Sequence, residues 1–185
     1  MKKNILVLVG SPRPKGNSQV LAETFAAAAR EKGHEVEVLR VGGMKIAGCL
    51  ACERCWKKDG LPCVQQDDMQ KLYPKLNVAD MIVFAAPIYY FGLPSQLKAV
   101  IDRFYPLCHG DDKRRAFADK ESALILCGAS EEEDDFEPAV ANYEVMADYL
   151  GWEDRGVIVA PGLGEIGDAA KSEWLEAARD LAMDL

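Results

Sequence analysis

The chain has 185 residues, a length that fits one domain, since single hydrophobic cores usually stop growing above roughly 250 residues. Its 22 basic and 30 acidic residues leave a net charge of −8, which argues against nucleic-acid or anionic-membrane partners, because both select a basic face. No apolar run approaches the roughly 18 to 20 residues of a membrane span, and no signal peptide is visible, so we expect a cytoplasmic protein with reduced thiols.

Five short segments predict strands. Four are apolar, rich in branched residues and bounded by Gly or Pro, as is typical of buried parallel strands: 4–10, 81–87, 123–128 and 156–162. Residues 34–41 instead alternate charged and apolar side chains, a pattern that indicates a half-exposed strand at a sheet edge.

Amphipathic stretches between these segments predict helices. One follows Pro94, which suits a first helical turn, and another is closed by Gly151, a common helix stop. A further helix after Asp67-Asp68-Met69 would contain Pro74. The other apolar stripes comprise Leu21, Phe25 and Ala28; Leu97, Val100, Ile101 and Phe104; Phe136, Val140, Tyr143 and Leu150; and Trp174, Leu175, Ala178 and Leu181.

This alternation of strands and helices predicts an α/β fold, a doubly wound five-stranded parallel sheet with helices on both faces. No repeat or linker divides the chain, so we expect one domain over 1–185 with a cysteine-rich insertion at about 42–66. Ligands of such sheets bind beyond the carboxyl ends of the strands, where the candidate site should lie.

The loop after the first strand, "GSPRPKGNSQ" (10–19), has the composition of a phosphate cradle that opens a helix. It offers hydroxyl, amide and positively charged groups from Ser11, Arg13, Lys15, Asn17 and Ser18. The simpler alternative is a rigid turn capped by Asn17 or Ser18. The dinucleotide fingerprint G-x-G-x-x-G and the P-loop G-x-x-x-x-G-K-[ST] are both missing from the sequence, which leaves mononucleotide binding.

Two further loops have features of a site for a flat, redox-active ring. Tyr89, Tyr90 and Phe91 cluster before Gly92, directly after the third strand of the chain. The alternative is that the three aromatic residues simply pack beneath a loop. Gly128, after the fourth strand, is small enough to let a ring edge approach.

Four of the six cysteines form the motif C-x2-C-x2-C-x7-C: Cys49, Cys52, Cys55 and Cys63. Two-residue gaps of this kind wrap 4Fe–4S clusters in bacterial ferredoxins, whereas structural zinc more often uses two separated pairs. A cluster, a zinc ion and free or oxidised thiols all remain open from the spacing.

Together these motifs closely resemble the flavodoxin-like NADPH-dependent FMN reductase family, and especially its iron–sulfur flavoprotein branch. The resemblance covers residues 4 to about 130 and rests on "GSPRPKGNS", "CLACERC" and "APIYYFGLPSQLKAVIDRF". It implies that FMN phosphate is held by Ser11, Arg13, Asn17 and Ser18. It also implies that the ribityl chain and ring are lined by Pro87, Ile88, Tyr89, Tyr90, Phe91, Gly92 and Gly128.

Two functions follow from this resemblance. One is an FMN-dependent NAD(P)H oxidoreductase passing electrons to a quinone, flavin or other small acceptor; the other is an electron-transfer protein that carries FMN and a 4Fe–4S cluster and serves a partner such as ferredoxin. The resemblance also implies a homodimer or homotetramer. With only His34 and His109 in the chain, a Ser–His–Asp hydrolase is a poor fit. Substrate or partner contacts are expected to vary at 108–120.

Overall fold

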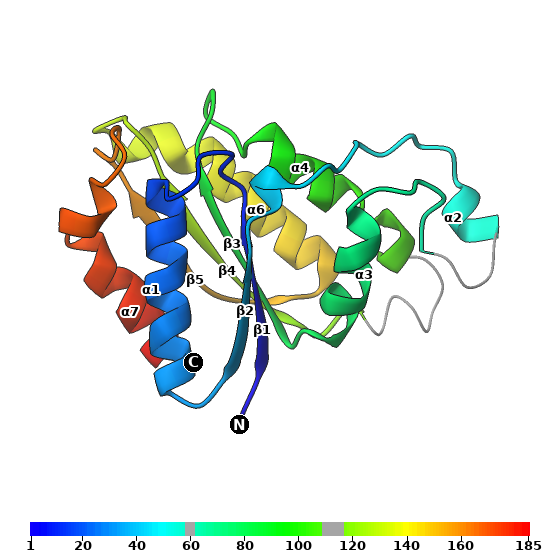
Figure 1. Cartoon of the computed structure of the whole chain (residues 1–185), viewed down its shortest axis with the longest axis horizontal. Helices are drawn as coiled ribbons and strands as arrows, with labels where there is room; N and C mark the ends of the chain where they lie inside the picture. The colour runs from blue at the N-terminus through cyan, green and yellow to red at the C-terminus, as the bar shows by residue number, and fades with distance from the viewer. Residues whose placement is uncertain (58–61, 109–116) are drawn as a thin grey trace.

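The computed structural model describes residues 1–57, 62–108 and 117–185, and its five strands form one parallel sheet (Figure 1). The strand order is β2-β1-β3-β4-β5, and the order in which the strands are added reverses between β1 and β3. The strands are β1 (Asn4–Val9), β2 (Glu35–Leu39), β3 (Met81–Pro87), β4 (Glu121–Cys127) and β5 (Glu153–Ala160). His109, Gly60 and most of the 108–120 segment lie outside the described residues.

The sheet confirms the predicted α/β architecture, and β2 lies at an edge as its alternating pattern indicates. The strand expected at 156–162 is different from the prediction in two respects. It runs from Glu153 to Ala160 rather than over 156–162, and it is only partly buried, because it forms the other edge of the sheet. A central strand and an edge strand covered by helices can have the same apolar sequence, so the sequence of this run alone does not predict its burial.

Helices cover both faces of the sheet, as Figure 1 shows: α1 (Asn17–Glu31) and α7 (Trp174–Met183) pack on one face. The opposite face carries α3 (Met69–Val78), α4 (Ser95–Asp102) and α6 (Glu137–Leu150). Alternate residues of each strand face these two layers. In β1, for example, Ile5 and Val7 join the core beneath α1, whereas Leu6 and Leu8 join the core beneath α3.

The helix boundaries follow local chemistry. Gly151 ends α6 with a left-handed φ of 72°, and its N–H caps the carbonyls of Ala147 and Asp148. Pro94 is the residue before α4 rather than part of its first turn. Pro74 does lie inside α3, where its exposed ring faces solvent. None of the helices in the described part of the chain combines the length and apolar character needed to cross a bilayer.

Candidate functional site

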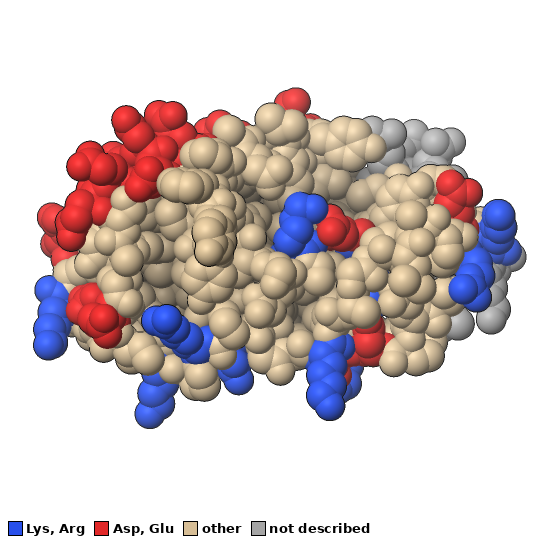
Figure 2. Space-filling view, turned by 90° about the horizontal axis from the view of Figure 1, so that it is seen from above, with Lys and Arg blue, Asp and Glu red and all other residues tan. Residues whose placement is uncertain are grey.

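A pocket of about 230 Å³ opens at the carboxyl ends of β1, β3, β4 and β5. It lies beside the switch in strand order, where doubly wound sheets bind their ligands. Figure 2 views the molecule from this end and shows acidic side chains gathered to one side of the face. The pocket is lined by Ser11, Arg13, Gly16, Asn17, Ser18, Pro87, Ile88, Tyr89, Cys127, Gly128, Ala129, Leu163, Gly164 and Ile166.

The loop after β1 and the first turn of α1 form the polar wall of this pocket. Arg13 is exposed at the rim, and its backbone N–H donates to Ser11 Oγ at 3.2 Å. Ser18 is 1% exposed, and its Oγ makes no hydrogen bond of normal geometry within the described structure, although it lies near the Cys127 thiol. A buried hydroxyl and a helix N-terminus facing one hollow form a site suited to an anion.

Asn17 lines the same pocket, but its side chain is committed to the chain itself. Its Nδ2 donates to the carbonyls of Leu163 (3.0 Å) and Glu165 (2.8 Å). Its Oδ1 accepts from the N–H groups of Gly167 and Ala169, both at 3.2 Å. Asn17 therefore fastens the loop after β5 to the start of α1.

A turn after β2, η1 (Val41–Gly43), supports the loop after β1 from behind. A Cβ added at Gly42 would lie 2.2 Å from the Ser11 carbonyl oxygen, so only glycine permits this approach. Arg40 Nη1 donates to the Pro12 carbonyl at 3.3 Å. Neither residue was expected at the site from the sequence, although the "VGG" that follows the second strand is a signal of close backbone approach.

The aromatic loop divides into two parts. Pro87, Ile88 and Tyr89 line the pocket, whereas Tyr90, Phe91 and Gly92 are not among its lining residues. Tyr89 and Gly92 form an isolated antiparallel bridge around a two-residue turn in which Tyr90 and Phe91 have φ values of 48° and 62°. Two consecutive left-handed residues with side chains are strained, and Tyr90 is fully exposed. This turn points its aromatic rings into solvent at the pocket mouth.

The floor of the pocket is formed at the end of β4. A Cβ at Gly128 would lie 2.9 Å from Ile88 Cγ1 and 3.0 Å from Phe136 Cζ, so the backbone here is closely packed. Burial raises the pKa of the Cys127 thiol to about 12, which keeps it protonated near neutral pH. The opposite wall, Leu163, Gly164 and Ile166, comes from the loop after β5, whose "GLGEIG" was not singled out from the sequence.

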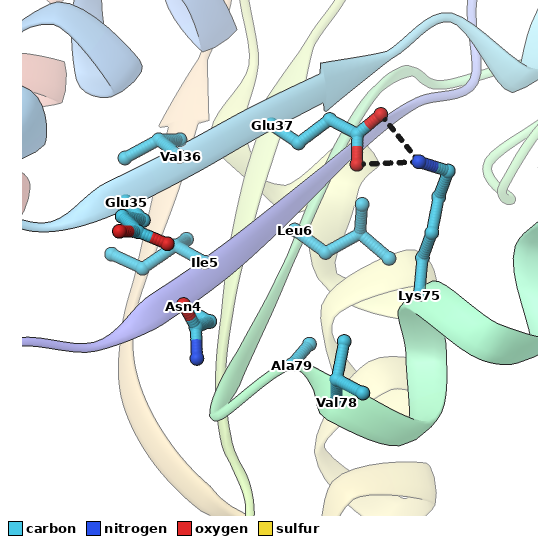
Figure 3. A pocket seen from close by; sticks show the side chains of 9 residues that line it. All are labelled: Asn4, Ile5, Leu6, Glu35, Val36, Glu37, Lys75, Val78 and Ala79. Carbon is cyan, nitrogen blue, oxygen red and sulfur yellow. Dashed lines mark hydrogen bonds and ion pairs between the residues drawn. The ribbon is translucent and has the colours of Figure 1, made fainter.

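A second hollow, of about 350 Å³, lies at the amino-terminal half of β1 and β2 beside α3 (Figure 3). Lys75 reaches from α3 to both carboxylate oxygens of Glu37 at 2.8 Å. This ion pair is substantially exposed, and exposed pairs contribute little free energy. The remaining lining is mostly aliphatic, including Leu6 and Val78, and the hollow lies at the end of the sheet opposite the functional loops.

The four cysteines of the motif occupy the long connection between β2 and α3. Cys49 and Cys52 are exposed, Cys55 is half-buried and Cys63 is buried. The pKa of Cys55 is raised, first by burial and then by the other three thiols, so each of those three lies within electrostatic range of Cys55. In the residues that the structure describes, no three Cys, His, Asp or Glu side chains converge on a single point.

The two ends of this cysteine loop are tied together at its base. Asp67 accepts from the Ala47 N–H at 3.0 Å and pairs with Arg103, at 2.9 Å to Nη1 and 3.2 Å to Nη2. Arg103 Nη1 also donates to the Ala47 carbonyl at 2.9 Å. Ala47 precedes the first cysteine of the motif and Asp67 follows the last, so one guanidinium closes the loop.

These residues fit the groups that the resemblance implies to different degrees. The buried Ser18 hydroxyl, the helix N-terminus and Arg13 fit the phosphate of FMN. The thiol donors fit an iron–sulfur cluster in kind, but the described thiols do not converge on one point as cluster ligands would.

The sheet order and the carboxyl-end pocket define a flavodoxin-like protein. The chain belongs to the NADPH-dependent FMN reductase family, which it matches over residues 3–135. It is 29% identical over 174 residues to an iron–sulfur flavoprotein of Archaeoglobus fulgidus, a match that covers 94% of this chain and 74% of the relative.

One further relative and one solved structure are also similar to this chain. The chain is 36% identical over 123 residues to an iron–sulfur flavoprotein of Methanosarcina thermophila, covering 65% of this chain and 61% of that relative. The fold is similar to an NAD(P)H:quinone oxidoreductase from Methanothermobacter marburgensis, with a TM-score of 0.74, 18% identity and 98% of each chain covered. At that identity the structural likeness supports the fold alone.

Proposed function

We propose that this chain binds FMN in the carboxyl-end pocket and acts as an NAD(P)H-dependent oxidoreductase in the cytoplasm. The electrons would pass to a quinone, a flavin or another small acceptor. The observation that carries this proposal is the buried Ser18 hydroxyl, which makes no hydrogen bond of normal geometry in the described structure and lies at the first turn of α1 in the pocket. Family membership supports FMN as the ligand.

Bound FMN would supply the redox chemistry, accepting a hydride and releasing electrons. The protein would contribute binding and positioning. Ser11, Arg13 and Ser18 would hold the phosphate, with Arg13 providing the charge. Ile88 and the close-packed backbone at Gly128 would border the ring, while the exposed Tyr90 and Phe91 would meet an acceptor or a second subunit. We therefore also propose a homodimer or homotetramer.

The test is purification without oxygen, followed by an absorbance spectrum and release of the flavin. We expect a yellow protein with about one FMN per chain, and NAD(P)H oxidation that depends on added quinone. Colourless protein that also fails to bind added FMN would overturn the proposal.

A second candidate function is an electron-transfer protein in which Cys49, Cys52, Cys55 and Cys63 hold a 4Fe–4S cluster. The relatives named iron–sulfur flavoprotein and the electrostatic proximity of Cys55 to the other three thiols favour it. Flavin that is reduced by reduced ferredoxin, but not by NAD(P)H, would support this role. Iron and acid-labile sulfide in anaerobic protein, lost in Cys52→Ser while FMN stays bound, would identify the cluster.

A further inference from the structure

Three consecutive carbonyl oxygens of the loop after β1 lie against the chain that follows β2. A Cβ added at Gly42 would be 2.6 Å from the carbonyl oxygen of Gly10 and 2.2 Å from that of Ser11. The third carbonyl, that of Pro12, accepts from Arg40 Nη1 at 3.3 Å. A trans peptide points its carbonyl and its N–H in opposite directions, so any N–H of these peptides points away from η1.

The peptide between Pro12 and Arg13 is the one that bears on an anion in the pocket. Its N–H donates to Ser11 Oγ at 3.2 Å, and both Ser11 and Arg13 line the pocket. Because Ser11 Oγ accepts this bond, its own O–H can donate to a ligand. If the peptide turned over, the Pro12 carbonyl oxygen would take the place of the N–H and would repel a phosphate. The bond from Arg40 holds this carbonyl on the side away from Ser11 Oγ.

The guanidinium of Arg40 lies close to the backbone of Gly43. A Cβ at Gly43 would be 2.6 Å from both Nη atoms, so glycine leaves the space that the guanidinium occupies. Arg40 is half-buried, and no carboxylate in the described part of the chain forms an ion pair with it. A partly buried cation without a counterion makes the local electrostatic potential positive, which favours an anion across the loop.

A role in stability alone accounts poorly for an arginine at position 40. A bond to one neutral carbonyl contributes little net free energy, whereas fixing a long arginine side chain costs conformational entropy. The Gly42 backbone also supports the same loop without help from Arg40. Arg30 offers a comparison, because its Nη2 donates to the Val36 carbonyl at 2.8 Å near the other end of α1, away from the pocket.

We infer that Arg40 is a positioning residue for phosphate binding in the carboxyl-end pocket. It keeps the Pro12 carbonyl turned away, so that the Arg13 N–H and the Ser11 hydroxyl stay on the side of the anion, and it adds positive charge behind the loop. This inference rests on the proposed function. It concerns the phosphate end of FMN and not the ring.

The test compares the affinities of flavin-free protein for FMN and for riboflavin, which lacks the phosphate. Arg40→Met removes the charge and the donor, whereas Arg40→Lys keeps a charge and a donor but loses the planar fork. Gly43→Ala keeps Arg40 but displaces its guanidinium, because the new Cβ would take its place. Arg30→Met is the matched control, since it removes a similar bond from an arginine to a backbone carbonyl outside the pocket.

We expect Arg40→Met to weaken FMN binding by about tenfold and to leave riboflavin binding unchanged, because only FMN carries the phosphate. Arg40→Lys should recover part of the loss, Gly43→Ala should weaken FMN binding in the same direction, and Arg30→Met should change neither affinity. Inorganic phosphate gives a second readout. It should raise the melting temperature of flavin-free wild type more than that of Arg40→Met.

The possible failures are distinguishable. Equal losses of FMN and riboflavin affinity in Arg40→Met would show that Arg40 only maintains the shape of the pocket, and an unchanged FMN affinity would show that it does not act on the site. Either result overturns the inference and leaves the proposed function standing. Wild type that binds neither flavin overturns both.

Two measurements keep the test decisive. Gly43→Ala replaces Arg40→Met in the comparison if Arg40→Met does not fold. If riboflavin binds too weakly to titrate, the phosphate-dependent rise in melting temperature decides, and equal rises in wild type and variant overturn the inference.

Discussion

Neighbouring residues of one loop have different tasks, which their burial and contacts distinguish. Arg13 is exposed at the pocket rim, and its side chain makes no hydrogen bond or ion pair with the described residues. Asn17, four residues later, is buried and bonded four times within the chain. Substitution at Arg13 should therefore affect binding, and substitution at Asn17 should affect the shape of the pocket.

We expect Arg13→Ala to weaken FMN binding by about 1.5 to 3 kcal/mol, the range of a lost charge-assisted hydrogen bond. The stability of the flavin-free protein should change little, because Arg13 is exposed. FMN titration by fluorescence measures the first effect and thermal unfolding the second. Lys15→Ala is the control, since Lys15 is exposed and is not among the lining residues. Equal affinities of Arg13→Ala and wild type would place the phosphate elsewhere.

His34 should make stability depend on pH. It is buried between the end of α1 and β2, where Nδ1 accepts from the Lys3 N–H at 3.1 Å and Nε2 has no partner in the described structure. Burial, followed by the nearby charges of Lys3 and Lys32, lowers its pKa from the model-compound value of 6.5. As the pH falls, the unfolded chain therefore binds the proton first.

The stabilisation from neutral His34 is complete above about pH 6.5 and is lost as the pH falls through the lower pKa of the folded protein. We expect His34→Asn, which keeps an acceptor for Lys3 but does not titrate, to lose less stability than wild type over this interval. Urea unfolding between pH 7 and pH 5 measures the difference. Parallel curves for the two proteins would show that His34 is not the group responsible.

At the scale of elements, the pocket is formed by several loops that the sheet brings together at one edge. The loop after β5 is attached to α1 through Asn17, and the turn after β2 packs against the loop after β1 at Gly42. Each attachment joins elements distant in sequence. The pocket thus depends on residues that need not touch a ligand.

Asn17→Ala should destabilise the protein by about 2 to 4 kcal/mol, because it removes four hydrogen bonds and leaves backbone groups near Leu163 and Ala169 without partners. Asn17→Asp keeps the two acceptor bonds but sets a carboxylate oxygen against the carbonyl oxygens of Leu163 and Glu165, so a loss at least as large is expected at neutral pH. Urea unfolding of flavin-free protein measures both. An unchanged stability in Asn17→Ala would mean that the loop after β5 is held by other contacts.

At the scale of the whole molecule, the free energy of unfolding should depend on FMN, because a ligand that binds only the folded chain stabilises it. FMN at 100 times its dissociation constant should stabilise the fold by about 2.7 kcal/mol. The melting temperature should rise with FMN concentration in wild type and should rise less, at the same concentration, in Arg13→Ala. A melting temperature that does not depend on FMN would contradict binding to the folded protein.

The sequence by itself determined the local features. Runs of branched apolar residues determined the strands, helical periodicity and Gly151 determined α6, and the composition of the loop after β1 indicated an anion site. Ser11, Ser18, Ile88 and Gly128 follow strand ends, and parallel strands end at one edge of a sheet, so their meeting in one pocket was predictable.

Only the tertiary structure decided which side chains are already bonded or packed within the chain and which remain available to a ligand. It placed β5 at an edge, committed the Asn17 amide to the loop after β5, turned Tyr90 away from the pocket, and paired the buried Arg103 with Asp67. Hydrogen bonds between residues more than a hundred positions apart, and the direction of a side chain at a strained turn, depend on packing. Packing is a property of the whole fold, and no local pattern of residues encodes it.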